Sequence, residues 1–181
     1  MLAQEALLRL GLDRVLLVPA AVPPHKAVAD EPGAEVRAEL CELAVAGDPR
    51  LAVSLVELER GGTSYTVDTL RSLRAASPQD ELTLILGADM AASLPSWREP
   101  QDVLALARPA VAQRAGTDRG AVLGALGGLA GGEAAVFFDM PLIEISSSAI
   151  RGRVAAGEPV RYLVPAAVAV RIAELGLYRH G

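Results

Sequence analysis

The sequence is poor in several residue types, and each shortage excludes a class of protein. Aromatic residues make up only 3% of its 181 residues, so it lacks the aromatic faces on which many nucleic-acid-binding modules stack bases. Its one cysteine, Cys41, excludes a disulfide framework and a cysteine-based zinc cluster. Its only lysine, Lys26, follows His25, one of two histidines. In a chain rich in alanine, glycine and arginine, such rare residues are the first candidates for a functional site.

Charge and hydropathy exclude further partners. The net charge of −5 at pH 7 argues against a sequence-independent grip on a nucleic-acid backbone. The longest uncharged stretch, Gly120 to Gly132, is too short and too rich in glycine to cross a bilayer, and the first residues do not resemble a signal peptide. We therefore predict one cytoplasmic domain over residues 1–181, with neither nucleic acid nor a membrane as partner. The oligomeric state does not follow from the sequence.

Short apolar runs alternate with segments of helical spacing. We expect buried strands over residues 14–18, 81–86, 109–113 and 134–138, and a further strand over 51–58. Helices are expected over residues 2–10, 34–46, 64–76, 101–107, 121–130, 146–156 and 165–175. This alternation predicts an α/β fold with a doubly wound, Rossmann-like parallel sheet. Ligands of such sheets bind beyond the carboxyl ends of the strands, so the residues after each strand are candidate ligand contacts.

Two segments have the composition of a phosphate-binding site. In Val22–Lys26, two prolines restrict the backbone, so His25 and Lys26 would bind phosphate oxygens at little cost in entropy. A solvated turn is the alternative. In Ile145–Arg151, three serines open a helix, where free N–H groups, hydroxyls and the Arg151 guanidinium would converge. The alternative there is a serine cap beside a solvated arginine.

Three more positions suit a nucleotide ligand. The segment Gly62–Thr66 opens a helix whose free N–H groups suit a carboxylate or a phosphate, and taken alone it is explained better as an ordinary N-cap. Gly87 follows a strand and permits close approach of a ligand, and Asp89 could bind ribose hydroxyls or cap a helix. Trp97, the only tryptophan, stands among prolines and charges, which favours stacking on an aromatic ligand over core packing.

In this order along the chain, these segments resemble those of bacterial nicotinate mononucleotide adenylyltransferases, a family of the nucleotidyltransferase superfamily. The resemblance runs from Leu2 to Tyr178 and rests on GLDRVLLVP, VPPHK, SYT, LGAD, LPSW, the strand at 109–114, EISSSAIR and the closing YLVP…LGLYR. It implies a transfer of the adenylyl group of ATP, with Mg²⁺, to nicotinate mononucleotide. The products would be deamido-NAD, a precursor in NAD biosynthesis, and pyrophosphate.

The resemblance also implies a role for each candidate residue. Lys26 and Arg151 would be catalytic, and His25, Tyr65, Thr66 and Trp97 would bind the mononucleotide. ATP would be bound by Gly87, Asp89, Arg114, Ile145, Ser146 and Ser148. No protein ligands for a metal are implied, and no covalent intermediate, because the mononucleotide phosphate attacks the α-phosphorus of ATP in line.

The chain departs from the family pattern at its start. That pattern begins with a strand and loop reading roughly G-G-x-F-[DN]-P-x-H-x-G-H, whereas Met1 falls inside the helix that follows. The family's histidines there bind ATP phosphates, and the strand is central in the sheet. We therefore expect an N-terminally incomplete domain that is insoluble or inactive alone, through a start assigned too far downstream, a truncation or a genuine loss. A non-catalytic nucleotide-binding remnant, and a transferase for phosphopantetheine or nicotinamide mononucleotide, stay as alternatives.

Overall fold

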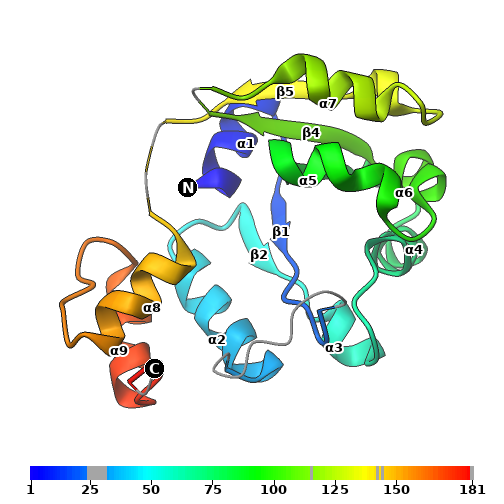
Figure 1. The fold of residues 1–181 in the computed structure, drawn as a ribbon. Coiled ribbons are helices and arrows are strands. Elements are labelled where there is room, and N and C mark those ends of the chain that lie inside the picture. Colours follow the sequence, from blue (N-terminus) through cyan, green and yellow to red (C-terminus); the bar gives the residue numbers. More distant parts are fainter. Residues whose placement is uncertain (24–31, 115, 142, 144, 180–181) are drawn as a thin grey trace. The chain divides into compact units, whose positions relative to one another are not determined.

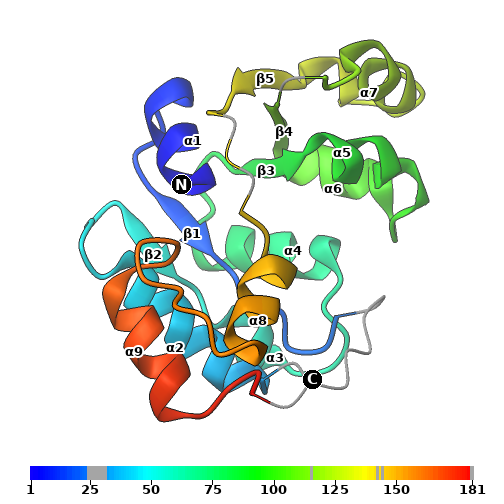
Figure 2. The ribbon, with the colours of Figure 1, turned by 60° about the vertical axis from the view of Figure 1, so that its left-hand side comes forward.

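A computed structural model describes residues 1–23, 32–114, 116–141, 143 and 145–179. The chain divides into two compact units, and Figures 1 and 2 together label their α-helices and β-strands. The first unit consists of Met1–Val15 and Ser64–Leu142, and the second consists of Leu16–Thr63 and Ile143–Gly181.

The first unit is built on a parallel sheet of three strands in the order β3-β4-β5. Its strands and helices are α1 (Leu2–Leu10), α4 (Thr66–Ala76), β3 (Thr83–Gly87), α5 (Ala88–Ser93), η1 (Leu94–Ser96), α6 (Pro100–Leu106), β4 (Arg108–Gln113), α7 (Arg119–Leu126), η2 (Gly132–Ala134) and β5 (Val136–Asp139). The four middle residues of β4 are all buried, because a central parallel strand is covered on both faces.

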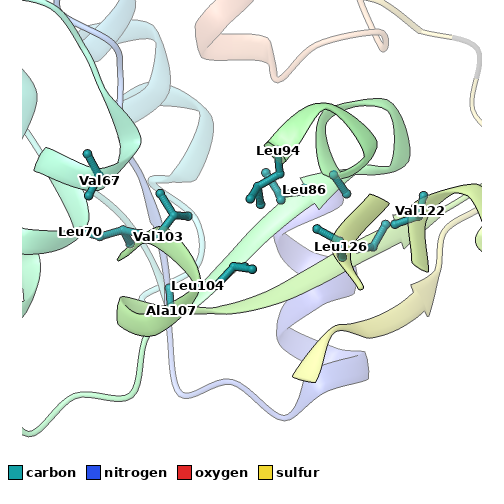
Figure 3. Close-up of a cluster of buried hydrophobic side chains, with 11 residues drawn as sticks. Val67, Leu70, Leu86, Leu94, Val103, Leu104, Ala107, Val122 and Leu126 are labelled. Atoms are coloured by element: carbon teal, nitrogen blue, oxygen red, sulfur yellow. The ribbon is translucent and has the colours of Figure 1, made fainter. Parts of the chain in front are cut away.

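Alternate residues of β4 point into two different buried clusters, as the pleat of a strand requires. Val111 belongs to a large cluster on the face covered by α4 to α7, which Figure 3 shows. Ala110 and Ala112 belong to a smaller cluster with Ala6 of α1 and Phe138 of β5. Helices thus cover both faces of this sheet, which confirms the doubly wound α/β arrangement predicted from the sequence.

The second unit contains a smaller sheet, in which β1 pairs with β2. Its elements are β1 (Val15–Leu17, which begins on the last residue of the first unit), α2 (Ala34–Val45), β2 (Leu51–Val53), α3 (Val56–Arg60), α8 (Ser147–Ala155) and α9 (Ala166–Glu174). Helices α2 and α9 pack together, as Figure 2 shows, with Arg171 Nε 2.8 Å from Glu39 Oε1. On α2, burial raises the pKa of the half-buried Cys41 thiol, as expected for a structural cysteine.

One strand prediction is wrong in its extent. The expected strand over residues 51–58 ends at Val53, and residues 56–60 form the helix α3. Two acidic residues, Glu57 and Glu59, lie in the first turn of α3, where a helix dipole favours negative charge. The apolar alternation of the segment hid this signal. Among the described residues, no helix is long and apolar enough to cross a membrane.

Candidate active site

The carboxyl edge of the three-stranded sheet gathers two of the predicted ligand contacts. Gly87 ends β3 opposite Ala112 of the neighbouring β4, and Arg114 follows the last residue of β4. A Cβ atom built at Gly87 would meet no protein heavy atom within 4 Å, so the space beside its backbone is open. Asp89 lies exposed in the first turn of α5, whose N-cap is Gly87. These residues therefore lie where parallel sheets bind ligands.

The predicted mononucleotide contacts lie on the same buried cluster of the first unit. Tyr65 is the N-cap residue of α4, without a capping hydrogen bond from its own side chain, and Thr66 is the first residue of the helix. Tyr65 and Trp97 both pack, partly buried, against the cluster of Figure 3. The indole Nε1 of Trp97 donates a hydrogen bond of 3.1 Å to Ser93 Oγ. One part of the Trp97 side chain therefore packs against the core, and the rest is accessible.

A charged network that the sequence analysis missed adjoins these aromatic residues. The guanidinium carbon of Arg98 lies 4.6 Å from the centre of the Tyr65 ring, and Arg98 Nε is 3.3 Å from Glu99 Oε1. Arg71 binds Glu99 at 2.6 Å and Asp102 at 2.5 Å. The hydrogen bond from Arg71, helped by a weaker one from Arg98, lowers the pKa of Glu99 and keeps it anionic at neutral pH.

In the second unit, the predicted ATP contacts meet at the start of α8. The Oγ of Ser146 accepts a hydrogen bond of 3.1 Å from the backbone N–H of Ala149, so Ser146 is an N-cap, as the alternative to a phosphate cradle required. Arg151 donates to Ser148 Oγ at 3.2 Å. Ile145, just before the cap, is 42% exposed. Three of these side chains therefore share one helix end.

A pocket of about 280 Å³ adjoins this helix end within the second unit. Its lining residues come from α2, α8 and α9 and from the segments before, between and after these helices: Pro32, Arg37, Ser147, Ile150, Arg151, Val164, Ile172 and Tyr178. Of these residues, only Arg151 and the serine run were candidate ligand contacts from the sequence alone. Tyr178 belongs to the closing LGLYR segment, which implied no role for it. Arg37 reaches this pocket through tertiary packing, and no local motif pointed to it.

His25 and Lys26 lie outside the described residues, but Arg37 contacts the chain on both sides of them. Its guanidinium donates to the carbonyl oxygen of Pro32 at 2.9 Å and to those of Ala20 and Ala21. One cation thus joins residues before and after the segment that includes the only lysine. Elsewhere in the described residues, no group of three or more His, Cys, Asp or Glu side chains could hold a metal ion.

Comparison with known proteins gives one consistent result. Residues 1–153 match the cytidylyltransferase-like family. A probable nicotinate-nucleotide adenylyltransferase of Thermus thermophilus is 45% identical over an alignment of 186 positions, which covers 98% of this chain and 88% of that protein. A relative of the same name from Geobacillus thermodenitrificans is 38% identical over 177 residues, or 98% of this chain and 77% of that protein.

Solved structures share the fold at low sequence identity. The structure of Plasmodium falciparum nicotinic acid mononucleotide adenylyltransferase complexed with NaAD matches with a TM-score of 0.73. The alignment covers 94% of this chain and 84% of the Plasmodium falciparum chain, and the sequence identity is 14%. A second structure of that enzyme, complexed with APC, matches with a TM-score of 0.69.

Proposed function

Because the chain belongs to the cytidylyltransferase-like family, we propose that it transfers the adenylyl group of ATP to nicotinate mononucleotide. The observation that carries this proposal is the 38–45% identity, over 98% of the chain, to nicotinate-nucleotide adenylyltransferases. The products are deamido-NAD and pyrophosphate, so the reaction is a step of NAD biosynthesis. With ATP as donor, it belongs in the cytoplasm, the compartment predicted above.

The acceptor side of the proposed reaction is the aromatic part of the first unit. Tyr65, Thr66 and Trp97 hold the pyridine ring and its carboxylate. The packing of both aromatic rings against one buried cluster supports this assignment, because a ring fixed from beneath can stack on a ligand at little cost in entropy. His25 and Lys26 act near the mononucleotide and the reacting phosphates, with Lys26 as a point charge.

The candidate ATP contacts are assigned within each unit separately. Gly87 and Asp89 bind ribose or adenosine, with Arg114 near them, and the open space beside Gly87 supports this role. Ile145, Ser146, Ser148 and Arg151 bind the ATP phosphates. Hydroxyls, free N–H groups and a guanidinium at one helix end form a suitable cradle for phosphate, and this supports the second assignment.

The chemistry needs no covalent intermediate. An oxygen of the mononucleotide phosphate attacks the α-phosphorus of ATP in line, and the bond from that phosphorus to the bridging oxygen of pyrophosphate breaks. The chain's residues contribute in two ways. They hold the two phosphates in line, and the positive charges of Lys26 and Arg151 stabilise the phosphate oxygens that become more negative.

Mg²⁺ accompanies ATP in this reaction, but the described residues contain no group of side chains that could form a metal site. We therefore assign no protein ligand to the metal and no catalytic step to it. Mg²⁺ keeps several waters and binds chiefly through substrate phosphates in many nucleotide enzymes, so a dedicated protein cage is not required.

The function is tested by calorimetric binding and by pyrophosphate release with ATP and three acceptors: nicotinate mononucleotide, nicotinamide mononucleotide and phosphopantetheine. We expect nicotinate mononucleotide to bind at least about tenfold more tightly than its amide, because a site built for a carboxylate leaves donors unpaired beside an amide. Tighter binding of phosphopantetheine, or equal binding of acid and amide, would contradict the proposal.

A substitution at Trp97 tests the binding of the mononucleotide separately from the binding of ATP. The substitution Trp97→Ala should weaken mononucleotide binding far more than ATP binding, because only the pyridine ring stacks on it. Trp97→Phe keeps an aromatic ring and should retain most of the affinity. An equal loss for both substrates in Trp97→Ala would remove Trp97 from the acceptor site.

A further inference from the structure

Arg98 occupies an unusual position for a surface arginine. Its guanidinium carbon lies 4.6 Å from the centre of the Tyr65 ring, within the range of a cation–π contact. The Arg98 side chain is 52% exposed, whereas the Tyr65 ring is partly buried against the core. A positive charge is therefore held at the solvent side of an aromatic ring that is fixed from beneath.

The turn that carries Arg98 is built to hold this position. The next residue, Glu99, has φ 51° and ψ 56°, a left-handed backbone that a glutamate rarely adopts. Arg71 of α4 binds the Glu99 carboxylate at 2.6 Å and also Asp102 of α6 at 2.5 Å. Since Arg71 binds both Glu99 and the first turn of α6 that follows it, these contacts also restrain the backbone from which Arg98 extends.

The charge of Arg98 is only partly engaged. Glu99 contacts Arg98 through Nε alone, at 3.3 Å. Over the ranges that the structure describes, no hydrogen bond or ion pair uses the two terminal nitrogens of Arg98. These nitrogens can therefore donate to an incoming group, and paired N–H donors of a guanidinium match the two oxygens of a carboxylate.

We propose that Arg98 determines the preference for an acid over an amide by binding the carboxylate of the pyridine ring. This inference rests on the proposed function, which places that ring at Tyr65 and Trp97. A pyridine carboxylate there meets a guanidinium already held in place, and its charge is neutralised. A carboxamide carries no charge, and its NH₂ group would face the donors of Arg98.

The test compares dissociation constants for nicotinate and nicotinamide mononucleotides, measured by calorimetry on wild type, Arg98→Met, Arg98→Lys and Arg119→Met. Arg119 is a matched control, because its guanidinium carbon lies 4.4 Å from the Phe137 ring in the same unit, outside the candidate site. Arg98→Met should lower the acid-to-amide ratio of affinities about five- to tenfold. Arg98→Lys, which keeps the charge but not the planar fork, should give an intermediate ratio, and Arg119→Met should give the wild-type ratio.

The outcomes separate this inference from the proposed function. A wild type that binds the acid tightly, together with an Arg98→Met variant of unchanged ratio and unchanged melting temperature, would overturn the role of Arg98 alone. An equal fall in Arg119→Met would also overturn it, because the loss would then be structural. A wild type without preference for the acid would contradict the proposed function and the inference together. A further supporting result is a wild-type preference that falls as salt rises, with no such salt dependence in Arg98→Met.

Discussion

The two units hold their candidate residues by different means. In the first unit, Gly87 and Arg114 follow strands of a parallel sheet whose two faces are covered by buried clusters. In the second unit, Ser146, Ser148 and Arg151 stand at the end of a nine-residue helix. That helix borders a pocket whose wall includes the charged side chain of Arg37.

The difference lies in what fixes each half. Several side chains of the first cluster are completely buried, Leu94 and Leu126 among them, and apolar burial there positions the strand ends. Neither of the two buried clusters includes described residues of the second unit, where directional polar contacts join its elements, such as the bonds of Arg37 to backbone carbonyls and of Arg171 to Glu39. The first half should therefore be sensitive to cavities, and the second to the loss of single polar groups.

The largest expected effect comes from a cavity in the first unit. Leu94 has no exposed surface and belongs to the cluster of Figure 3, so Leu94→Ala should lower the free energy of unfolding by about 3–5 kcal/mol. Ile172→Ala in the second unit should cost about 2 kcal/mol, because Ile172 borders a pocket and already lacks packing partners on one side. Urea denaturation measures both. A larger loss for Ile172→Ala would reverse the comparison.

The next effect concerns a polar contact in the second unit. Arg37→Gln removes the cation that joins Pro32 to Ala20 and Ala21. Because Lys26 is the only lysine, a lysine-specific protease cleaves the chain at this one position. We expect Arg37→Gln to speed this cleavage on the order of tenfold, since charge-assisted bonds that restrain the flanking residues are lost.

A matched arginine in the first unit provides the control. Arg74 also donates to backbone carbonyls, those of Pro78 at 3.4 Å, Asp80 at 2.5 Å and Leu106 at 3.1 Å. Arg74→Gln should leave the cleavage rate after Lys26 near the wild-type value. If both variants speed cleavage equally, general destabilisation explains the result, and Arg37 has no special effect on the segment.

A smaller effect separates binding from stability at the edge of the first sheet. Gly87 has φ −73°, which any residue adopts, and a Cβ there meets no protein atom within 4 Å. Gly87→Ala should therefore change the unfolding free energy by less than about 0.5 kcal/mol. It should nevertheless weaken ATP binding about tenfold, because the methyl group enters the space proposed for the nucleotide.

The control for this substitution is another glycine with open surroundings. Gly124, inside α7, also has no heavy atom within 4 Å of an added Cβ and lies outside the candidate site. Gly124→Ala should leave ATP binding unchanged and stabilise the helix slightly. Wild-type ATP affinity in Gly87→Ala, measured by calorimetry, would remove Gly87 from the donor site.

The sequence predicts the local features of both units, but not the contacts between residues that are far apart in the chain. The strands around residues 15–17, 83–87, 108–113 and 136–139 were predictable, because short apolar runs between polar turns mark buried parallel strands. The Ser146 cap was predictable because it is local. The contacts of Arg71 with Glu99 and Asp102 were not, because they join residues 28 and 31 positions apart, and no short motif encodes such a pairing.

The smallest expected effect is on the pH dependence of stability. Here the first unit, and not the second, should depend more on a single polar contact. The pKa of Asp48, in the second unit, is lowered from 3.8 to about 2 by hydrogen bonds from Arg50. Arg71 lowers the pKa of Glu99, in the first unit, below its usual 4.5. A depressed carboxyl pKa stabilises the fold above the ordinary pKa, and this stabilisation is lost as the pH falls through the folded-state value.

Stability should therefore fall between about pH 4 and pH 2 through Asp48, and below about pH 4.5 through Glu99. Asp48 and Arg50 are two residues apart, so their pair can also form in the unfolded chain, whereas Glu99 meets Arg71 only in the fold. Urea midpoints measured from pH 2 to 5 should lose more of their pH dependence in Glu99→Gln than in Asp48→Asn. A steeper loss in Asp48→Asn would place the acid-sensitive contact in the second unit, since it would show that this local pair depends on the native structure.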